Sequence, residues 1–156
     1  MKKKLVLVLC SAMMAMSLVA CGGSDKPEEK PQEATKQTMK DGTYEVDTKD
    51  DKDGGAKVSI TVKDGKITEA KYNEFTKEGN KRENKEYNAQ MKEVAKTSPE
   101  TFEVEFEKQV VAAQNHEIDG VTGATGSTAQ AKQLFQKAIE NAEAGKTDKE
   151  TIEIKK

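Results

Sequence analysis

The sequence predicts an α+β domain, in which a small antiparallel sheet built on a β-hairpin packs with about three helices. Val58, Ile60 and Val62 alternate with polar residues, which is the pattern of a half-buried strand. Asp64-Gly65 follows this run and favours a two-residue hairpin turn. From residue 87 onward, apolar residues recur at three- and four-residue spacing, which is typical of amphipathic helices.

The expected strands occupy the first half of the domain. Asp41-Gly42 is a turn signal, and the β-branched and aromatic bias of residues 43–46 predicts a first strand. The clearest strand covers residues 56–63, and residues 66–75 supply the returning strand after the hairpin turn. Strands joined by so short a turn pair in antiparallel fashion.

Three helices are expected after the strands. The first lies around residues 87–95, and the second begins at Ser98-Pro99, with serine as N-cap and proline at the first helical position. The third runs from about residue 127 to residue 144, with Gly145 as its stop. The residues expected on the buried faces of the three helices are Tyr87, Met91, Val94, Ala95, Phe102, Phe106, Val110, Ala131, Leu134, Phe135, Ala138, Ile139 and Ala142.

Residues 146–156 form a charged C-terminal tail. Ile152 and Ile154 alternate with polar residues within it. A short edge strand and a loose tail both fit this pattern.

Composition limits both the size of the domain and its function. Hydrophobic residues make up 34% of the 156-residue chain and charged residues 35%, which suffices for the core of one domain. The single histidine argues against a multi-histidine metal centre, a haem site or a histidine-dependent hydrolase. The formal net charge is −2 and becomes more negative if Lys2–Lys4 are removed, so the chain is expected to bind no nucleic acid.

Residues 1–20 have the pattern of a bacterial lipoprotein signal peptide. Lys2–Lys4 form a positive start, and the apolar stretch that follows is short for a membrane-spanning helix. Leu18-Val19-Ala20-Cys21 resembles the lipobox of bacterial lipoproteins, which implies that Cys21 receives a diacylglycerol. Two acyl chains anchor a protein stably, which places the domain at the extracytoplasmic face of the bacterial cell membrane. An ordinary signal peptide and an uncleaved membrane anchor are the alternatives.

The other cysteine, Cys10, would leave with the signal peptide. The mature chain would then have no disulfide and no thiolate metal site.

Residues 21–40 are expected to be a lipidated, flexible tether. The segment from Ser24 to Lys40 has two prolines and almost no large apolar side chain, so it cannot bury enough surface to fold. It would lift the domain off the bilayer. A disordered spacer without a selected length fits the same sequence.

One stretch, from Asp119 to Thr128, has the character of a binding site. It is rich in glycines and hydroxyls and directly precedes the last expected helix. Small side chains let a ligand approach the backbone, and the N–H groups and dipole of a helix start favour an anion such as phosphate. The alternative is purely structural: Thr125 or Ser127 caps the helix, while Gly123 and Gly126 permit a tight turn.

Residues 119–125, Asp-Gly-Val-Thr-Gly-Ala-Thr, resemble the flavinylation motif of the FMN-binding domain family. This family occurs in subunits of sodium-pumping NADH:quinone oxidoreductases and Rnf complexes and in flavin-bearing bacterial lipoproteins. Asp41-Gly42-Thr43-Tyr44, the alternating strand, Asp64-Gly65-Lys66-Ile67 and the last helix follow the family's usual order. An FMN-binding domain is therefore expected over residues 41–145. The sequence departs from the usual pattern at Gly126, where the family often has a bulkier residue.

The resemblance implies that Thr125 carries FMN as a phosphoester, delivered from FAD by an FAD-dependent flavin transferase with the help of magnesium. The cofactor-binding residues it implies are Thr125, Asp119, Gly120, Thr122, Gly123, Ala124 and Ser127. It implies no catalytic residue and no resident metal. Asp119 would orient the loop or be recognised by the transferase, or simply form a turn with Gly120.

Other residues around this motif have less specific roles. His116 is expected to be a surface residue at the end of the second helix. Tyr44, Tyr72 and Phe75 are candidates to stack on the flavin, but each fits the core as well.

These features together suggest a membrane-anchored electron carrier rather than a self-sufficient enzyme. It would pass electrons from a membrane-bound reductase or quinol donor to external acceptors. A lipoprotein that binds FMN or another phosphate ligand noncovalently is the main alternative. A third hypothesis is a lipoprotein whose signal peptide releases a short pheromone from residues 15–20.

Overall fold

The computed structural model describes residues 38–49 and 54–155. The chain divides into two units, residues 1–34 and 35–156, and every described residue belongs to the second. The predicted signal peptide, Cys21 and most of the predicted tether lie outside the described residues.

The fold is α+β, as the sequence predicts. A five-stranded sheet has the order β4-β3-β2-β1-β5. Its central strands are β1 (Gly42–Thr48), β2 (Gly55–Lys63) and β3 (Lys66–Thr76), which pair in antiparallel fashion. Asp64 and Gly65 join β2 to β3 with φ angles of 52° and 70°, which suits a tight hairpin turn.

The two outer strands are short. β4 (Gly79–Asn80) pairs only with Phe75 and Thr76. β5 (Glu150–Ile152) pairs with β1 in parallel. The sheet is therefore mixed rather than wholly antiparallel, because part of the charged tail forms an edge strand parallel to β1. Ile152 and Ile154 are partly buried against the core, which gives this strand its attachment.

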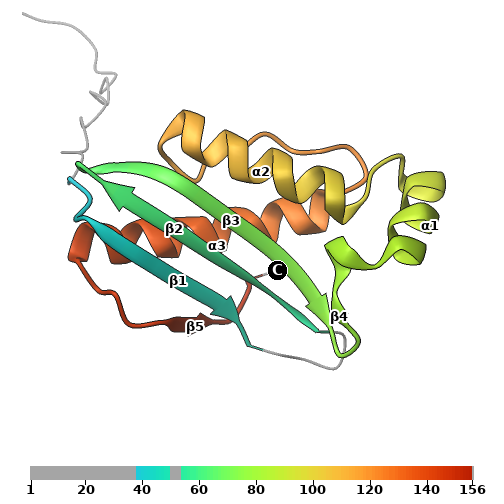
Figure 1. Cartoon of the computed structure of the whole chain (residues 1–156), viewed down its shortest axis with the longest axis horizontal. Helices are drawn as coiled ribbons and strands as arrows, with labels where there is room; N and C mark the ends of the chain where they lie inside the picture. The colour runs from blue at the N-terminus through green and yellow to red at the C-terminus, as the bar shows by residue number, and fades with distance from the viewer. Residues whose placement is uncertain (1–37, 50–53, 156) are drawn as a thin grey trace, which may run out of the picture. The chain divides into compact units, whose positions relative to one another are not determined.

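Two helices cover one face of the sheet. α2 (Pro99–Ala113) packs along β3, and α3 (Thr125–Ala144) packs against β1 and β2, as Figure 1 shows. Gly145, with φ of 72°, ends α3 at the predicted position. The core between the layers is formed by alternate strand residues and by one side of each helix: Tyr44, Val46, Val58, Ile60, Val62, Tyr72, Phe102, Phe106, Val110, Leu134, Phe135 and Ala138.

α1 (Lys85–Ala95) follows the short 3₁₀ helix η1 (Lys81–Glu83) and stands away from the sheet (Figure 1). The prediction that its apolar residues face the core was wrong for Val94, which is 85% exposed, and for Tyr87, which is 36% exposed. The buried residue of α1 is Asn88. Its amide donates to the carbonyls of Lys81, Arg82 and Asn84. Polar contacts therefore attach α1 to the domain.

α2 covers the open edge of β3 with its side chains. Because β4 pairs with only two residues, most of that edge has no neighbouring strand. Glu103 accepts a hydrogen bond from the Glu74 N–H at 2.9 Å, and Glu107 accepts one from the Tyr72 N–H at 3.1 Å. Gln114, just beyond the helix, bonds both the N–H and the C=O of Ile67 at 2.8 Å. These side chains take the place of a missing strand.

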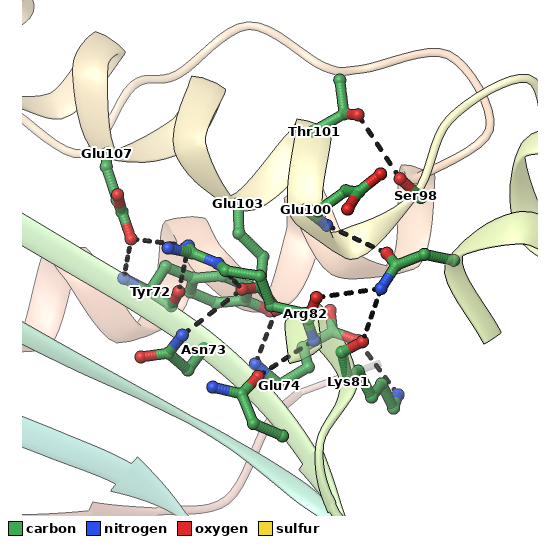
Figure 2. Close-up of polar contacts among 12 residues, drawn as sticks. Tyr72, Asn73, Glu74, Lys81, Arg82, Ser98, Glu100, Thr101, Glu103 and Glu107 are labelled. Atoms are coloured by element: carbon green, nitrogen blue, oxygen red, sulfur yellow. Dashed lines mark hydrogen bonds and ion pairs between the residues drawn. The ribbon is translucent and has the colours of Figure 1, made fainter. Parts of the chain in front are cut away.

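Arg82 neutralises much of the negative charge at this edge. Its guanidinium donates to Glu103 and Glu107, both at 2.6 Å, and to the Tyr72 carbonyl at 2.9 Å (Figure 2). Glu103 is fully buried. Burial raises the pKa of Glu103 to about 7, although the Glu74 N–H and Arg82 act in the opposite direction. The fully buried Glu103 and the partly buried Arg82 form an ion pair that joins α2, η1 and β3.

Replacing Glu103 with alanine is expected to lower the free energy of unfolding by roughly 3–5 kcal/mol, because the Glu74 N–H and Arg82 lose a buried acceptor. Glu105→Ala is the matched control on the same helix, since Glu105 is exposed and its carboxylate accepts a hydrogen bond from Gln109 one turn along. Its effect should stay within about 0.5 kcal/mol. Urea unfolding of both variants checks this, and equal losses would contradict the role given to Glu103.

Candidate functional site

The loop between α2 and α3 carries most of the predicted site residues, and buried contacts hold it in place. It leaves α2 at Gln114, which has a left-handed φ of 57° and is tied to β3. Ile118 is 2% exposed and anchors the loop in the core. The N–H of Asp119 donates to the side-chain oxygen of Gln109 on α2, while the Asp119 side chain is exposed. The first half of the loop is therefore held against β3, the core and α2, and this fixes where its last residues begin.

A tight turn joins this loop to α3. The Ala124 N–H donates to the Val121 carbonyl at 2.9 Å, and Gly123 has a φ of 84° at the third position of the turn. A Cβ on Gly123 would lie 2.2 Å from the Ala95 carbonyl oxygen at the end of α1. Glycine is required here both by the backbone conformation and by the close approach of α1.

α3 begins at Thr125, two residues earlier than predicted, and its N-cap is Ala124. No side chain of the described residues caps this start, so the structural interpretation in which Thr125 or Ser127 serves as the cap was wrong. The Thr128 hydroxyl instead donates to the Ala124 carbonyl at 2.8 Å. Since the first N–H groups of a helix have no partner within it, α3 presents donors with no side-chain acceptor.

The other helices in the described part of the chain differ from α3 in this respect. Asn80 accepts from η1, Asn84 from α1, and Asn88 from the Glu100 N–H at the start of α2. α3 also has no acidic residue in its first turn. Its start combines free donors with the positive end of a 20-residue helix, an arrangement that favours an anion.

A groove lies beside this helix start. It is a shallow, open groove of about 440 Å³, lined by Gly120, Val121, Thr122, Thr125, Thr128, Ala129 and Lys132. Thr125 is exposed, so its hydroxyl is accessible to a reagent from outside. The donors and the groove together suit a phosphate-bearing ligand such as FMN.

Tyr72 on β3 contacts the first turns of α3. Its buried hydroxyl lies 3.0 Å from Glu74 Oε1, 3.0 Å from Gln130 Oε1 and 3.5 Å from the Ser127 carbonyl. Burial, and next the charge of Glu74, hold the pKa of Tyr72 far above its ordinary value. Tyr72 is therefore a neutral donor that links β3 to the helix carrying Thr125.

The structure brings some of the predicted site residues together in the groove and places others around it. Gly120, Thr122 and Thr125 line it. Gly123 and Ala124 form the turn, and Ser127 contributes its carbonyl to Tyr72.

The remaining candidates lie away from the groove. Tyr44 and Tyr72 are 1% and 0% exposed, so they belong to the core. Phe75, near the end of β3, does not line the groove, and His116 lines a separate cavity.

Four residues that line the groove were not among the predicted cofactor-binding residues. Val121 and Thr128 lie within the glycine-rich stretch, whereas Ala129 and Lys132 lie beyond it and follow Thr125 by four and seven residues. Side chains at these spacings share one face of a helix. Ala129 and Lys132 could therefore have been predicted as neighbours of Thr125 if the helix had been expected to begin there. Among the residues that the structure describes, no group of three or more His, Cys, Asp or Glu side chains could hold a metal ion. Within the same ranges, no helix has the length and hydropathy needed to cross a membrane.

Gly123→Ala is expected to destabilise the domain by about 1–3 kcal/mol, because the new methyl group meets the Ala95 carbonyl and φ must stay positive. Gly126→Ala in the first turn of α3 is the control, since a Cβ there meets nothing within 4 Å. That change should leave stability unchanged or raise it by up to about 1 kcal/mol. Thermal unfolding of the two variants measures the difference, and a well-tolerated Gly123→Ala would show that the turn is not fixed by α1.

Two family models match parts of the chain. Residues 51–140, more than half of the chain, match the sequence model described as the FMN-binding domain. A second model, described as the peptidase propeptide and YPEB domain, matches residues 4–83 and does not reach α2, the loop or α3. No curated protein sequence matches the chain.

Two solved structures are similar to the chain. The crystal structure of the CPE2226 protein from Clostridium perfringens is 45% identical, with a TM-score of 0.72, and the match covers 75% of this chain and 99% of that one. A solution NMR structure of a Clostridium thermocellum protein is 22% identical, with a TM-score of 0.42, and the match covers 67% of this chain and 92% of that one. The first family match includes β2, β3, α2, the loop and Thr125, and the chain therefore belongs to the FMN-binding domain family.

Proposed function

We propose that this protein is an extracytoplasmic electron carrier whose FMN is attached to the Thr125 hydroxyl through a phosphoester. FMN is the cofactor of the domain, as the family match indicates. The observation that carries the covalent assignment is the position of Thr125. It is exposed, it is the first residue of an uncapped helix, and it lines the groove.

Phosphate attached at Thr125 would meet favourable electrostatics. The first-turn N–H groups of α3 supply donors that no described side chain occupies, and the helix dipole adds positive potential. The first turn contains no carboxylate that would repel the phosphate. The chain's own residues therefore bind and orient the phosphate end of the cofactor.

Activation of the Thr125 hydroxyl is assigned to a second protein. A threonine hydroxyl is a weak nucleophile, and no histidine or carboxylate lines the groove beside it. An FAD-dependent flavin transferase with a bound magnesium ion would supply the activation and the flavin phosphate. Exposure of Thr125 on the outside of the helix suits this reaction, because the acceptor must enter the transferase's active site.

FMN supplies reversible electron transfer when bound, while the protein positions it. The groove is open to solvent, so bound flavin would meet soluble acceptors such as ferric iron or small quinones. A membrane-bound reductase or quinol donor is the proposed source of electrons. Anchoring through Cys21 would keep the domain near that donor and raise its effective concentration there.

Thr125→Ala is expected to abolish covalent flavin and leave the fold nearly unchanged, because this exposed side chain makes no cap. Thr122→Ala is the matched control, since Thr122 lines the same groove in the turn before the helix. Each variant is co-expressed with a flavin transferase, and flavin fluorescence is read on a denaturing gel and assigned by peptide mapping. Flavin on Thr122, Ser127 or Thr128 would refute the assignment. Flavin that is present in the native protein but leaves on denaturation would favour noncovalent binding.

Cys21→Ser is expected to prevent lipidation, because a serine hydroxyl does not replace the thiolate in diacylglycerol transfer. Unprocessed precursor should accumulate, and the mature lipid-modified N-terminus should be absent from the mass spectrum. Cys10→Ser is the control, since Cys10 lies within the predicted signal peptide, and it should leave processing unchanged. A wild-type protein that is cleaved but carries no lipid would rule out the anchor.

A further inference from the structure

The groove beside Thr125 contains one charged lining residue, Lys132. The other residues that line it are glycine, valine, alanine and threonine. Lys132 is therefore the lining side chain that can interact with a ligand's charge through a full charge of its own.

Lys132 lies two helical turns beyond the hydroxyl of Thr125. Seven residues of α-helix correspond to a rise of about 10.5 Å, and the spacing places both side chains on one face of α3. Ala129 lies between them and also lines the groove. Its small side chain leaves the path from the hydroxyl to the ammonium group open along the helix.

The ammonium group of Lys132 is only lightly engaged. Its Nζ lies 3.3 Å from Glu117 Oε2, and the two side chains are 37% and 67% exposed. The other carboxylate oxygen of Glu117 lies 3.2 Å from His116 Nε2. A pair this exposed contributes little stability, so a ligand in the groove can compete for Lys132.

Two other cations of the domain, Arg82 and Lys81, are paired with carboxylates away from the groove. Arg82 is bound to Glu103 and Glu107, and Lys81 lies 3.0 Å from the nearly buried carboxylate of Glu74. Neither lines the groove. Asp119 and Glu117 are the carboxylates in the loop nearby, and both side chains are exposed.

We propose that Lys132 sets the reduction potential of the flavin held at Thr125, with Glu117 moderating its effect. This inference rests on the proposed function. A flavin ring that takes two electrons from a donor and one proton from solvent acquires one negative charge, and charge near the ring tunes this step. Lys132 stabilises that charge electrostatically and so raises the potential, while Glu117 draws the ammonium group away and lowers it.

The test uses full-length protein co-expressed with the flavin transferase. Four variants are compared with wild type: three remove one side-chain charge each, and one replaces Lys132 with another cation. Lys132→Gln removes the cation, Lys132→Arg keeps it, and Glu117→Gln frees it from its partner. Lys108→Gln on α2 is the charge-matched control, since Lys108 is exposed and does not line the groove. Covalent flavin is first quantified on a denaturing gel. The potential is then measured by dithionite titration against a reference dye at neutral pH.

Lys132→Gln should shift the redox equilibrium with the dye toward oxidised flavin by on the order of tenfold at low ionic strength, and less at high salt. Glu117→Gln should shift it in the opposite direction, while Lys132→Arg and Lys108→Gln should stay close to wild type. Opposite signs distinguish this role from a structural one, because loss of the ion pair alone would move both variants the same way.

Two results would overturn the inference while leaving the proposed function intact. One is a fully flavinylated Lys132→Gln protein with the wild-type potential. The other is a shift of the same sign in Lys132→Gln and Glu117→Gln. A wild-type protein without covalent flavin would instead refute the proposed function, and the role of Lys132 would fall with it.

Discussion

The open edge of β3 is the constraint on which the rest of the domain depends. A strand without a neighbour leaves backbone N–H and C=O groups exposed, and β4 is too short to satisfy more than the last two residues. α2 meets this need with Glu103, Glu107 and Gln114, all on the side that faces β3. Two carboxylates at a buried edge require a cation, and Arg82 from η1 provides it. The position of α2, and of the loop that follows it, is thereby set by hydrogen bonds to the backbone of β3.

Tyr72 connects the polar side chains at the edge of β3, Glu107 and Arg82, to the candidate site. The Tyr72 backbone bonds Glu107 and Arg82 on the edge side, and its side chain passes through the core to Gln130 and the Ser127 carbonyl. Its ring packs edge-on against Phe106 at 5.6 Å. α2, β3 and the first turns of α3 therefore form one packed unit. This packed unit supports the groove, which is lined by residues of one loop and one helix.

The sequence was sufficient for the features that depend on local pattern. The alternation of Val58, Ile60 and Val62 located β2, the Asp64-Gly65 turn located the hairpin and with it β3, and Gly145 located the end of α3. Long-range polar contacts were not predictable in this way. The burial of Glu103 has no signal in the local pattern, because glutamate seldom occupies a core, and the unpaired edge of β3 explains it. The prediction that Val94 is buried was wrong because it relied on spacing alone. Its spacing fits an amphipathic helix, but α1 is attached to the domain through the polar side chain of Asn88.

The start of α3 is where local preference and structure conflict most clearly. A hydroxyl residue often occupies the N-cap position, and Thr122, Thr125 and Ser127 lie within three residues of it in the sequence. Ala124 occupies it instead. Omitting a cap costs about 1 kcal/mol, and natural sequences depart from such local rules mainly at functional sites. An uncapped start also keeps its N–H groups free for a ligand, and it leaves Thr125 outside the cap geometry, where its hydroxyl stays accessible. The same feature that weakens α3 on its own thus supplies what a phosphate-linked cofactor would need.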